Sequence, residues 1–265
     1  HRRLKGKLSV VPKIKVSKNN LHLLYTPGVG EIVKLIAKDR RKANDYTIKG
    51  NSVAVVTDGS SVLGLGNMGA EAALPVMEGK ALLFKAMANI DAFPICLNTQ
   101  DVDEIVKTVT HIAPVFGGVN LEDISAPRCF EVEKRLQDIG IPVMHDDQHG
   151  TAVVVLAALL NAATVVHKKF EELRVVVNGA GAAGTAISKI LTCTNYSQNI
   201  CTSVKELVVC DSKGSIYKGR GDLQGHKEQL ADITNKNRKK GSLSEMMEGA
   251  DVFIGVSRGN IVHED

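Results

Sequence analysis

Residues 114–147 read PVFGGVNLEDISAPRCFEVEKRLQDIGIPVMHDD, and this stretch decides the fold. Two short apolar runs each stop at an acidic doublet, Glu122-Asp123 and Asp146-Asp147. Apolar residues at helical spacing between the doublets predict an amphipathic helix over residues 126–139. A right-handed strand–helix–strand crossover makes its two strands parallel. We therefore expect both doublets at the same edge of one sheet.

The crowding of four carboxylates predicts a metal site at this edge. A divalent cation would relieve their repulsion, and hard oxygen ligands suit Mg²⁺ or Mn²⁺. The alternative is that these are ordinary acids at helix N-termini. That alternative explains Glu122-Asp123 better than it explains Asp146-Asp147 before Gln148-His149-Gly150. His145 and His149 are candidate ligands, although an oxygen-rich site favours them as groups that orient the ligands.

A second motif, Gly179-Ala180-Gly181-Ala182-Ala183-Gly184, directly follows the Val-rich predicted strand at residues 174–177. A helix is expected next, and the following strand ends at Asp211, which is the context of a dinucleotide fingerprint. The glycines allow a tight turn, a close approach to a pyrophosphate and close helix–strand packing. Asp211 is placed to accept hydrogen bonds from ribose hydroxyls. The alternative is a tight turn that binds no ligand.

The remaining pattern predicts an α/β protein with two domains. Residues 1–150 are expected to form an N-terminal α/β catalytic domain with a parallel sheet. Residues 151–265 are expected to form a Rossmann-type dinucleotide-binding domain that is incomplete at its C-terminus. The other expected elements are strands at 53–56, 93–97, 207–210 and 251–256, and helices at 31–42, 70–88 (interrupted at Pro75 and Gly79), 101–112, 149–168 and 185–191.

Charge and composition restrict the function. Residues 1–50 hold 13 Lys and Arg against three Asp and Glu, so this arm carries +10 and, with a net charge of +4, the remainder carries −6. We interpret the basic arm as a solvated surface or a subunit contact, because nothing near it resembles a nucleic-acid module. The longest apolar run, 151–166, is short for a membrane span and predicts a buried helix. No nucleic-acid or membrane partner is expected.

The five cysteines show no metal-binding spacing. Cys96, Cys129 and Cys210 lie in apolar or helical surroundings. Such surroundings are typical of reduced, buried thiols in an intracellular protein. A cytoplasmic location is therefore expected.

Two further residues are candidates for acid–base chemistry. Lys80 lies in the helix after a Gly-rich loop, beside apolar residues that would lower its pKa and let it act as a base. Tyr25 lies in a Pro/Gly loop and either anchors the core or presents its phenol to a cleft. A solvated helix lysine and a packed tyrosine are the simpler alternatives.

Taken together, these motifs resemble the malic enzyme family, in the order and approximate spacing of its small, bacterial-type branch. The matching segments are Tyr25-Thr26-Pro27-Gly28-Val29, Gly64-Leu65-Gly66-Asn67-Met68-Gly69, Pro75-Val76-Met77-Glu78-Gly79-Lys80, Leu121-Glu122-Asp123-Ile124 and His145-Asp146-Asp147-Gln148-His149-Gly150-Thr151. The resemblance implies metal-dependent oxidative decarboxylation of malate to pyruvate and CO₂ by a homodimer.

The resemblance also implies roles for individual residues. Lys80 matches the family's general base and Tyr25 its general acid. Glu122, Asp123 and Asp147 match the metal ligands, with Asp146 beside them. The loop from Gly179 to Gly184 matches the dinucleotide loop. The cofactor is NAD or NADP, where Asp211 favours NAD by charge and Lys213 offsets it.

Two features depart from the family. Its members continue well beyond residue 265, so the dinucleotide domain and the substrate pocket are expected to be incomplete. The polar stretch Thr192–Ser203 is also longer than usual. A malolactic enzyme, which keeps its cofactor and releases lactate, is the close rival. A non-catalytic nucleotide- and metal-binding fragment is a rival of another class.

Overall fold

The computed structural model describes residues 3–4, 6–197 and 199–262, and it separates into two compact units. Unit 1 comprises His1–Ile124 and Val132–Met144, and unit 2 comprises Ser125–Glu131 and His145–Asp265. Each unit has a four-stranded sheet with helices, which confirms the predicted α/β class. The predicted boundary between residues 150 and 151 stays a prediction.

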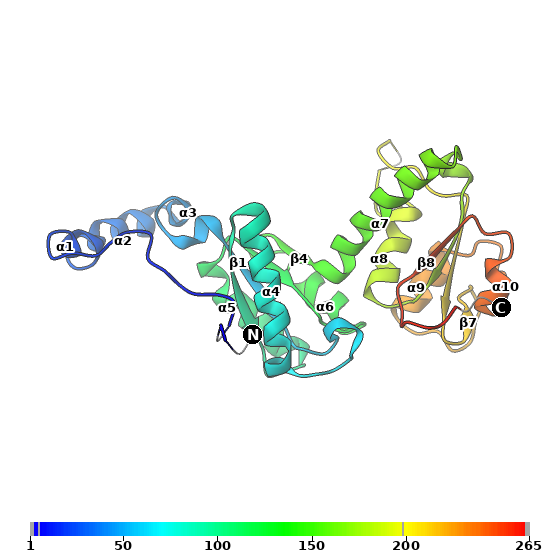
Figure 1. Cartoon of the computed structure of the whole chain (residues 1–265), viewed down its shortest axis with the longest axis horizontal. Coiled ribbons are helices and arrows are strands. Elements are labelled where there is room, and N and C mark those ends of the chain that lie inside the picture. Colours follow the sequence, from blue (N-terminus) through cyan, green and yellow to red (C-terminus); the bar gives the residue numbers. More distant parts are fainter. Residues whose placement is uncertain (1–2, 5, 198, 263–265) are drawn as a thin grey trace. The chain divides into compact units, whose positions relative to one another are not determined.

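Unit 1 begins with an arm of short helices that Figure 1 shows extending away from its sheet. The predicted helix at 31–42 ends early, at Lys38, because Asp39 is extended. The Asp39 carboxylate then accepts a hydrogen bond from Arg41 N at 3.1 Å and caps the next turn. The elements of the arm are α1 (Leu21–Leu24), α2 (Val29–Lys38), η1 (Arg40–Lys42), α3 (Ala43–Tyr46) and η2 (Ile48–Asn51).

The sheet of unit 1 has the strand order β2-β1-β3-β4, and β1 pairs in parallel with both β2 and β3. Its central strand β1 is almost fully buried, as a strand covered on both faces must be. The strands are β1 (Ser52–Thr57), β2 (Asp91–Cys96), β3 (Gly118–Leu121) and β4 (Val143–His145). The helices are η3 (Val62–Gly64), α4 (Ala70–Ala88), α5 (Val102–Ile112), η4 (Ala113–Val115) and α6 (Arg128–Arg135).

Helix α4 corrects the prediction of interruptions at Pro75 and Gly79, because it runs unbroken through both. Proline removes one backbone hydrogen bond from a helix, so packing must supply the difference. Ala73, Met77 and Ala81, spaced four residues apart, are buried, and α4 packs against β1 and β2. Tertiary packing therefore overrides the local preference. Helix α6 is shorter than the predicted 126–139.

Unit 2 has the strand order β7-β6-β5-β8, parallel except for the antiparallel β7. This confirms the predicted parallel sheet behind the Gly-rich loop. The strands are β5 (Arg174–Asn178), β6 (Glu206–Asp211), β7 (Gly214–Ser215) and β8 (Val252–Gly255). The helices are α7 (Asp146–Val165), η5 (Phe170–Glu172), α8 (Ala182–Leu191), α9 (His226–Ile233) and α10 (Leu243–Met247).

Helix α7 begins three residues earlier than predicted, so Asp146 and Asp147 form its first turn. One face packs into the core of unit 2 through Ala152, Leu159 and Ala163. The prediction of a buried helix is right for that face only, because Val153, Val154 and Val165 are exposed. By length and composition α7 is apolar enough to cross a membrane, a test that core helices also pass.

The cysteines include one pair that the sequence did not predict. Cys193 and Cys201 form a disulfide within the polar stretch after α8. Cys96, Cys129 and Cys210 are not part of a disulfide, as expected, and the last two are buried. Burial raises the pKa of the Cys210 thiol to about 11.

Candidate metal and dinucleotide sites

The first acidic doublet lies where β3 ends. Glu122 and Asp123 are both buried, although carboxylates are rarely buried without partners. Asp123 has φ +54°, a left-handed conformation that is uncommon for a residue other than glycine. Its backbone carbonyl accepts a hydrogen bond from Ser61 N at 2.9 Å. This turn directs the chain away from the strand immediately after the doublet.

Glu122 contacts polar side chains of unit 1. Lys80 Nζ lies 3.0 Å from Glu122 Oε1, and Asn120 Nδ2 donates a hydrogen bond to Glu122 Oε2 at 2.7 Å. The Lys80 side chain is 24% exposed, so it is not the solvated helix lysine of the simpler interpretation. Lys80 therefore lies beside the acidic doublet.

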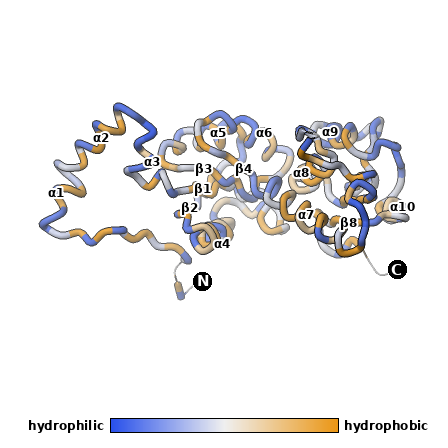
Figure 2. Tube along the Cα trace, turned by 90° about the horizontal axis from the view of Figure 1, so that it is seen from above, coloured by the Kyte–Doolittle hydropathy of each residue, from blue (hydrophilic) through white to orange (hydrophobic). Residues whose placement is uncertain are grey.

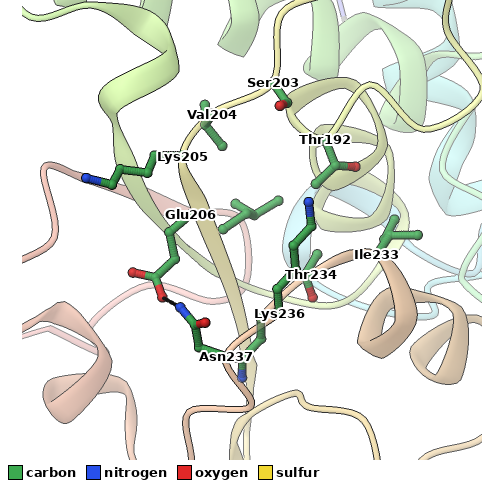
Figure 3. A pocket seen from close by; sticks show the side chains of 11 residues that line it. Thr192, Ser203, Val204, Lys205, Glu206, Ile233, Thr234, Lys236 and Asn237 are labelled. Atoms are coloured by element: carbon green, nitrogen blue, oxygen red, sulfur yellow. Dashed lines mark hydrogen bonds between the residues drawn. The ribbon is translucent and has the colours of Figure 1, made fainter. Parts of the chain in front are cut away.

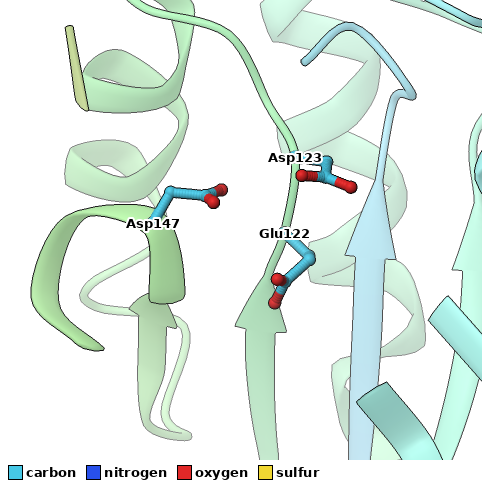
Figure 4. A group of neighbouring side chains, drawn as sticks. All are labelled: Glu122, Asp123 and Asp147. Atoms are coloured by element: carbon cyan, nitrogen blue, oxygen red, sulfur yellow. The ribbon is translucent and has the colours of Figure 1, made fainter. Parts of the chain in front are cut away.

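Glu122, Asp123 and Asp147 each offer a carboxylate oxygen, and these oxygens lie within 4.8 Å of one another. Figure 4 shows the three side chains together, with the strand before Glu122 and the strand before Asp147 pointing the same way. Of the four carboxylates expected to converge, three are thus grouped: both members of the first doublet and Asp147 of the second. Three hard oxygen donors at this spacing fit Mg²⁺ or Mn²⁺, which other carboxylate-rich sites also bind.

The two members of the second doublet, Asp146 and Asp147, lie in different surroundings. Asp146 is outside this group of ligand oxygens; its Oδ1 lies against Gly150, 2.2 Å from where a Cβ would stand. Any side chain at residue 150 would therefore displace that carboxylate. His145 is fully buried, with Nε2 3.6 Å from Asp147 Oδ2, which suits the predicted orienting role. His149 is exposed.

Tyr25 lies elsewhere in unit 1. It directly follows α1, at the far end of the arm in Figure 1, whereas Lys80 lies in α4 beside the sheet. The Tyr25 residue is 69% exposed. The structure thus brings Lys80 to the acidic edge and leaves Tyr25 away from it within one chain.

The Gly-rich loop of unit 2 has the geometry that its sequence predicted. A Cβ on Gly184 would stand 1.8 Å from the carbonyl oxygen of Gly179, so only glycine allows this close packing. Gly181 is the N-cap of α8, and a Cβ there would meet nothing within 4 Å. The loop therefore leaves open space at a helix N-terminus, where anions bind favourably.

Asp211 ends β6 as predicted, but its carboxylate is held by partners that sequence reasoning missed. Arg220 Nη1 and Nη2 donate to it at 3.0 and 2.6 Å, Lys227 Nζ at 2.7 Å and Lys213 N at 2.9 Å. Burial alone would raise the pKa of Asp211, but these hydrogen bonds outweigh burial and hold that pKa well below its ordinary value. The bonds use about four acceptor sites, the full capacity of a carboxylate. Only the basic residues soon after Asp211 hinted at this arrangement.

A cavity in unit 2 opens beside both features. It has a volume of about 820 Å³, and its lining includes Gly179, Ala180, Asp211, Lys213 and Arg258. A cavity of this size suits a small-molecule ligand or cofactor, and it lies at the carboxyl ends of β5 and β6, where α/β sheets bind ligands.

A smaller cavity of about 50 Å³ lies at the opposite end of β6 (Figure 3). There Asn237 Nδ2 donates a hydrogen bond to Glu206 Oε1 at 3.2 Å. This cavity is much smaller than the one beside the Gly-rich loop.

The sheet order and loop of unit 2 define a dinucleotide-binding protein. Residues 5–137 match the family model described as the malic enzyme N-terminal domain, and residues 148–263 match that of the malic enzyme NAD-binding domain. The chain belongs to the malic enzyme family, which confirms the resemblance read from the motifs.

Several relatives carry the comparison further. The bifunctional malic/malolactic enzyme of Bacillus subtilis is 55% identical over 97% of this chain and 62% of its own length. The NAD-dependent malic enzyme of Geobacillus stearothermophilus is 52% identical over 97% of this chain and 52% of its own length. The chain thus spans about half to three fifths of these relatives.

Solved structures agree with this fold. The structure of the NAD-dependent malic enzyme of Thermotoga maritima matches with a TM-score of 0.93 and 51% identity, covering 99% of this chain and 69% of that one. The malic enzyme of Entamoeba histolytica matches with a TM-score of 0.90 and 37% identity, covering 99% and 56%.

Proposed function

We propose that the protein containing this chain catalyses metal-dependent oxidative decarboxylation of malate to pyruvate and CO₂, with reduction of NAD or NADP. The observation that carries the proposal is the cluster of Glu122, Asp123 and Asp147 with Lys80 ion-paired at its edge. Family membership supports the same reaction. A cytoplasmic location, with no nucleic-acid or membrane partner, stays a prediction.

Glu122, Asp123 and Asp147 would hold Mg²⁺ or Mn²⁺. When bound, that cation supplies Lewis-acid polarisation of the malate hydroxyl and carboxylate and stabilises negative charge that develops on oxygen. Lys80, whose amine is beside Glu122, would in its neutral form accept the proton of the C2 hydroxyl, and a bound nicotinamide would supply the acceptor for the hydride from C2. Loss of CO₂ then leaves enolpyruvate, and Tyr25 donates the proton that C3 requires.

The position of Tyr25 bears on how two copies would pack in the proposed homodimer. Apolar side chains are exposed along the arm, and the hydropathy colours of Figure 2 mark hydrophobic residues in its N-terminal stretch and around α1. The most exposed of them are Val10 at 87%, Val11 at 73%, Leu4 and Tyr25 at 69% each, and Leu23 at 63%. Exposed apolar surface of this kind marks an interaction site. The arm of one copy covers a second copy and presents Tyr25 to the Lys80 of that copy.

Mixing two inactive variants tests this arrangement. Tyr25→Phe and Lys80→Ala proteins are each purified, then mixed under conditions that exchange subunits. If Tyr25 serves the partner's site, each mixed dimer contains one intact site, and activity returns to about a quarter of the wild-type value at full exchange. No recovery, in a mixture shown to contain mixed dimers, would place both residues in one chain's site.

The contacts of Asp211 bear on the cofactor. Its carboxylate is compensated by Arg220 and Lys227, so its charge no longer opposes a 2′-phosphate as strongly as the sequence suggested. Lys227 is the more exposed partner, with 34% of its side chain accessible. We infer that NADP is accepted as well as NAD: Lys227 leaves Asp211 free for the ribose hydroxyls of NAD or turns to the phosphate of NADP.

One relative's name makes the malolactic reaction a second candidate, since the Bacillus subtilis enzyme is called bifunctional. Product analysis separates the two outcomes. The whole protein is given malate and Mn²⁺ with NAD or NADP separately, and absorbance at 340 nm is followed. Net reduction with formation of pyruvate is expected; lactate without net reduction would favour the malolactic reaction, and neither product would reject both.

A further inference from the structure

His226, the first residue of α9, contacts the Gly-rich loop of unit 2. Its Nε2 lies 2.8 Å from the carbonyl oxygen of Ala180. A carbonyl oxygen only accepts hydrogen bonds, so the imidazole is the donor. Burial, more than the nearby Lys227 and Lys189, lowers the pKa of His226. At neutral pH the ring is therefore uncharged and carries its proton on Nε2.

The consequence for the loop follows from peptide geometry. The peptide between Ala180 and Gly181 is planar and trans, so its carbonyl and its N–H point in opposite directions. A carbonyl held by His226 therefore turns the Gly181 N–H away from α9. Gly181 caps α8 and faces open space. That N–H is then aimed where a pyrophosphate would bind at the helix N-terminus.

Glycines make this hydrogen bond more important than it would be in an ordinary turn. Gly179, with φ +129°, and Gly181 flank Ala180, and glycine leaves a backbone free to adopt many conformations. The His226 hydrogen bond restrains this segment from a side chain 46 residues later in the chain.

Phe130 holds the imidazole in turn. The two rings lie with centroids 5.0 Å apart and planes tilted by 45°, an arrangement that aromatic pairs prefer. Residue 130 lies within the range matched by the N-terminal domain model, yet Ser125–Glu131 belongs to unit 2 by its contacts. A short segment following Glu122 and Asp123 in the chain thus supports the residue that contacts the dinucleotide loop.

We propose that His226 is a positioning residue for the dinucleotide: it orients the Ala180–Gly181 peptide so that Gly181 N–H meets the pyrophosphate, and Phe130 fixes its ring. The inference rests on the proposed binding of NAD or NADP and on no step of malate chemistry. It separates two properties of His226, the N–H donor and the aromatic ring, which different substitutions remove.

The test measures NADH and NADPH binding to the whole protein by fluorescence titration, together with KM values for malate and dinucleotide. His226→Phe keeps a ring against Phe130 and removes the donor. His226→Gln removes the ring and keeps an amide donor. His111→Gln, in the exposed part of α5, is the control. A lost hydrogen bond is worth about 3- to 10-fold in affinity, so His226→Phe should raise Kd and the dinucleotide KM by about that factor.

In the same variant the malate KM should stay within about twofold of wild type, since Lys80 and the carboxylate cluster are unchanged. His226→Gln should recover most of the affinity. Equal Kd values for wild type and a folded His226→Phe variant would overturn the proposal, as would a Gln variant as weak as the Phe variant. His226→Ala replaces the Phe variant if the latter does not fold. If the wild type bound NADH but did not oxidise malate, the proposed function would fail while these Kd values still tested His226.

Discussion

The carboxylate cluster and the Asp211 site differ in the ratio of acidic to basic side chains. At the first, Glu122, Asp123 and Asp147 bring their carboxylate oxygens together, and Lys80 forms an ion pair with Glu122. At the second, one carboxylate, Asp211, has Arg220 and Lys227 as partners. The first arrangement brings three carboxylates together where a cation could bind, whereas in the second the acceptor sites of one carboxylate are taken by basic side chains and a backbone N–H. We therefore expect the first site to select a metal cation, and the second to influence the choice between NAD and NADP.

We therefore expect the largest loss of activity when metal binding at the carboxylate cluster is weakened, and smaller effects from single substitutions at the Asp211 site. We predict that Asp147→Asn abolishes Mn²⁺-dependent malate oxidation while the fold survives. Loss of one anionic ligand removes several kcal/mol of charge stabilisation, so the rate at limiting Mn²⁺ should fall by about 10³-fold or more. Without metal, melting should occur at the wild-type temperature or higher, because the cluster has less repulsion. Normal turnover at low Mn²⁺ would reject the assignment.

Lys80 is proposed to act as the general base and not as a metal ligand. Lys80→Ala should lower malate oxidation by about 10²–10⁴-fold, the usual contribution of a general base. Binding of Mn²⁺ should persist, since all three carboxylates remain. The measurement is kcat for malate, with Lys85→Ala as the control from the same helix. A Lys80→Ala enzyme with wild-type kcat would return Lys80 to a structural role.

The charge balance at Asp211 predicts an effect on stability. Arg220→Ala would leave a buried carboxylate with Lys227 as its remaining cationic partner, which should cost about 3 kcal/mol of unfolding free energy. The lowered pKa of Asp211 makes its contribution fully present above the unfolded pKa of about 3.9, and lost as pH falls below that value. The variant should therefore lose less stability than the wild type when denaturation is repeated at pH 3. Equal losses of stability in the wild type and the variant would show that the Asp211–Arg220 pair does not cause this pH dependence.

The smallest expected effect is on cofactor preference. Asp211→Ala should raise KM for NAD more than for NADP, because the carboxylate would otherwise accept from ribose hydroxyls. Lys227→Gln should do the reverse, since a cation near the 2′-phosphate is lost. Opposite shifts in the ratio of the two kcat/KM values are the signature. If neither substitution alters this ratio, other residues of the cavity determine the preference for NAD or NADP.

The parts predictable from sequence were those governed by local rules. Gly184 had to be glycine for close packing, and the acids at strand ends had to meet because a crossover makes strands parallel. The unbroken α4 could not be predicted at Pro75, because burial of Met77 and its neighbours overrides the local preference. Arg220 and His226 were missed for another reason: their partners, Asp211 and Ala180, lie 9 and 46 residues away, beyond any periodic pattern.

The carboxylate cluster is tested most directly as a metal site by titrating the metal-free whole protein with Mn²⁺ and following the free ion by electron paramagnetic resonance. We predict one tightly bound Mn²⁺ per wild-type chain at the carboxylate cluster and a large loss of affinity in Asp147→Asn. Asp146→Asn should bind nearly as well as wild type, because that carboxylate lies outside the group of ligand oxygens. Equal affinity in the wild type and the Asp147→Asn variant would contradict the claim that this cluster is the metal site.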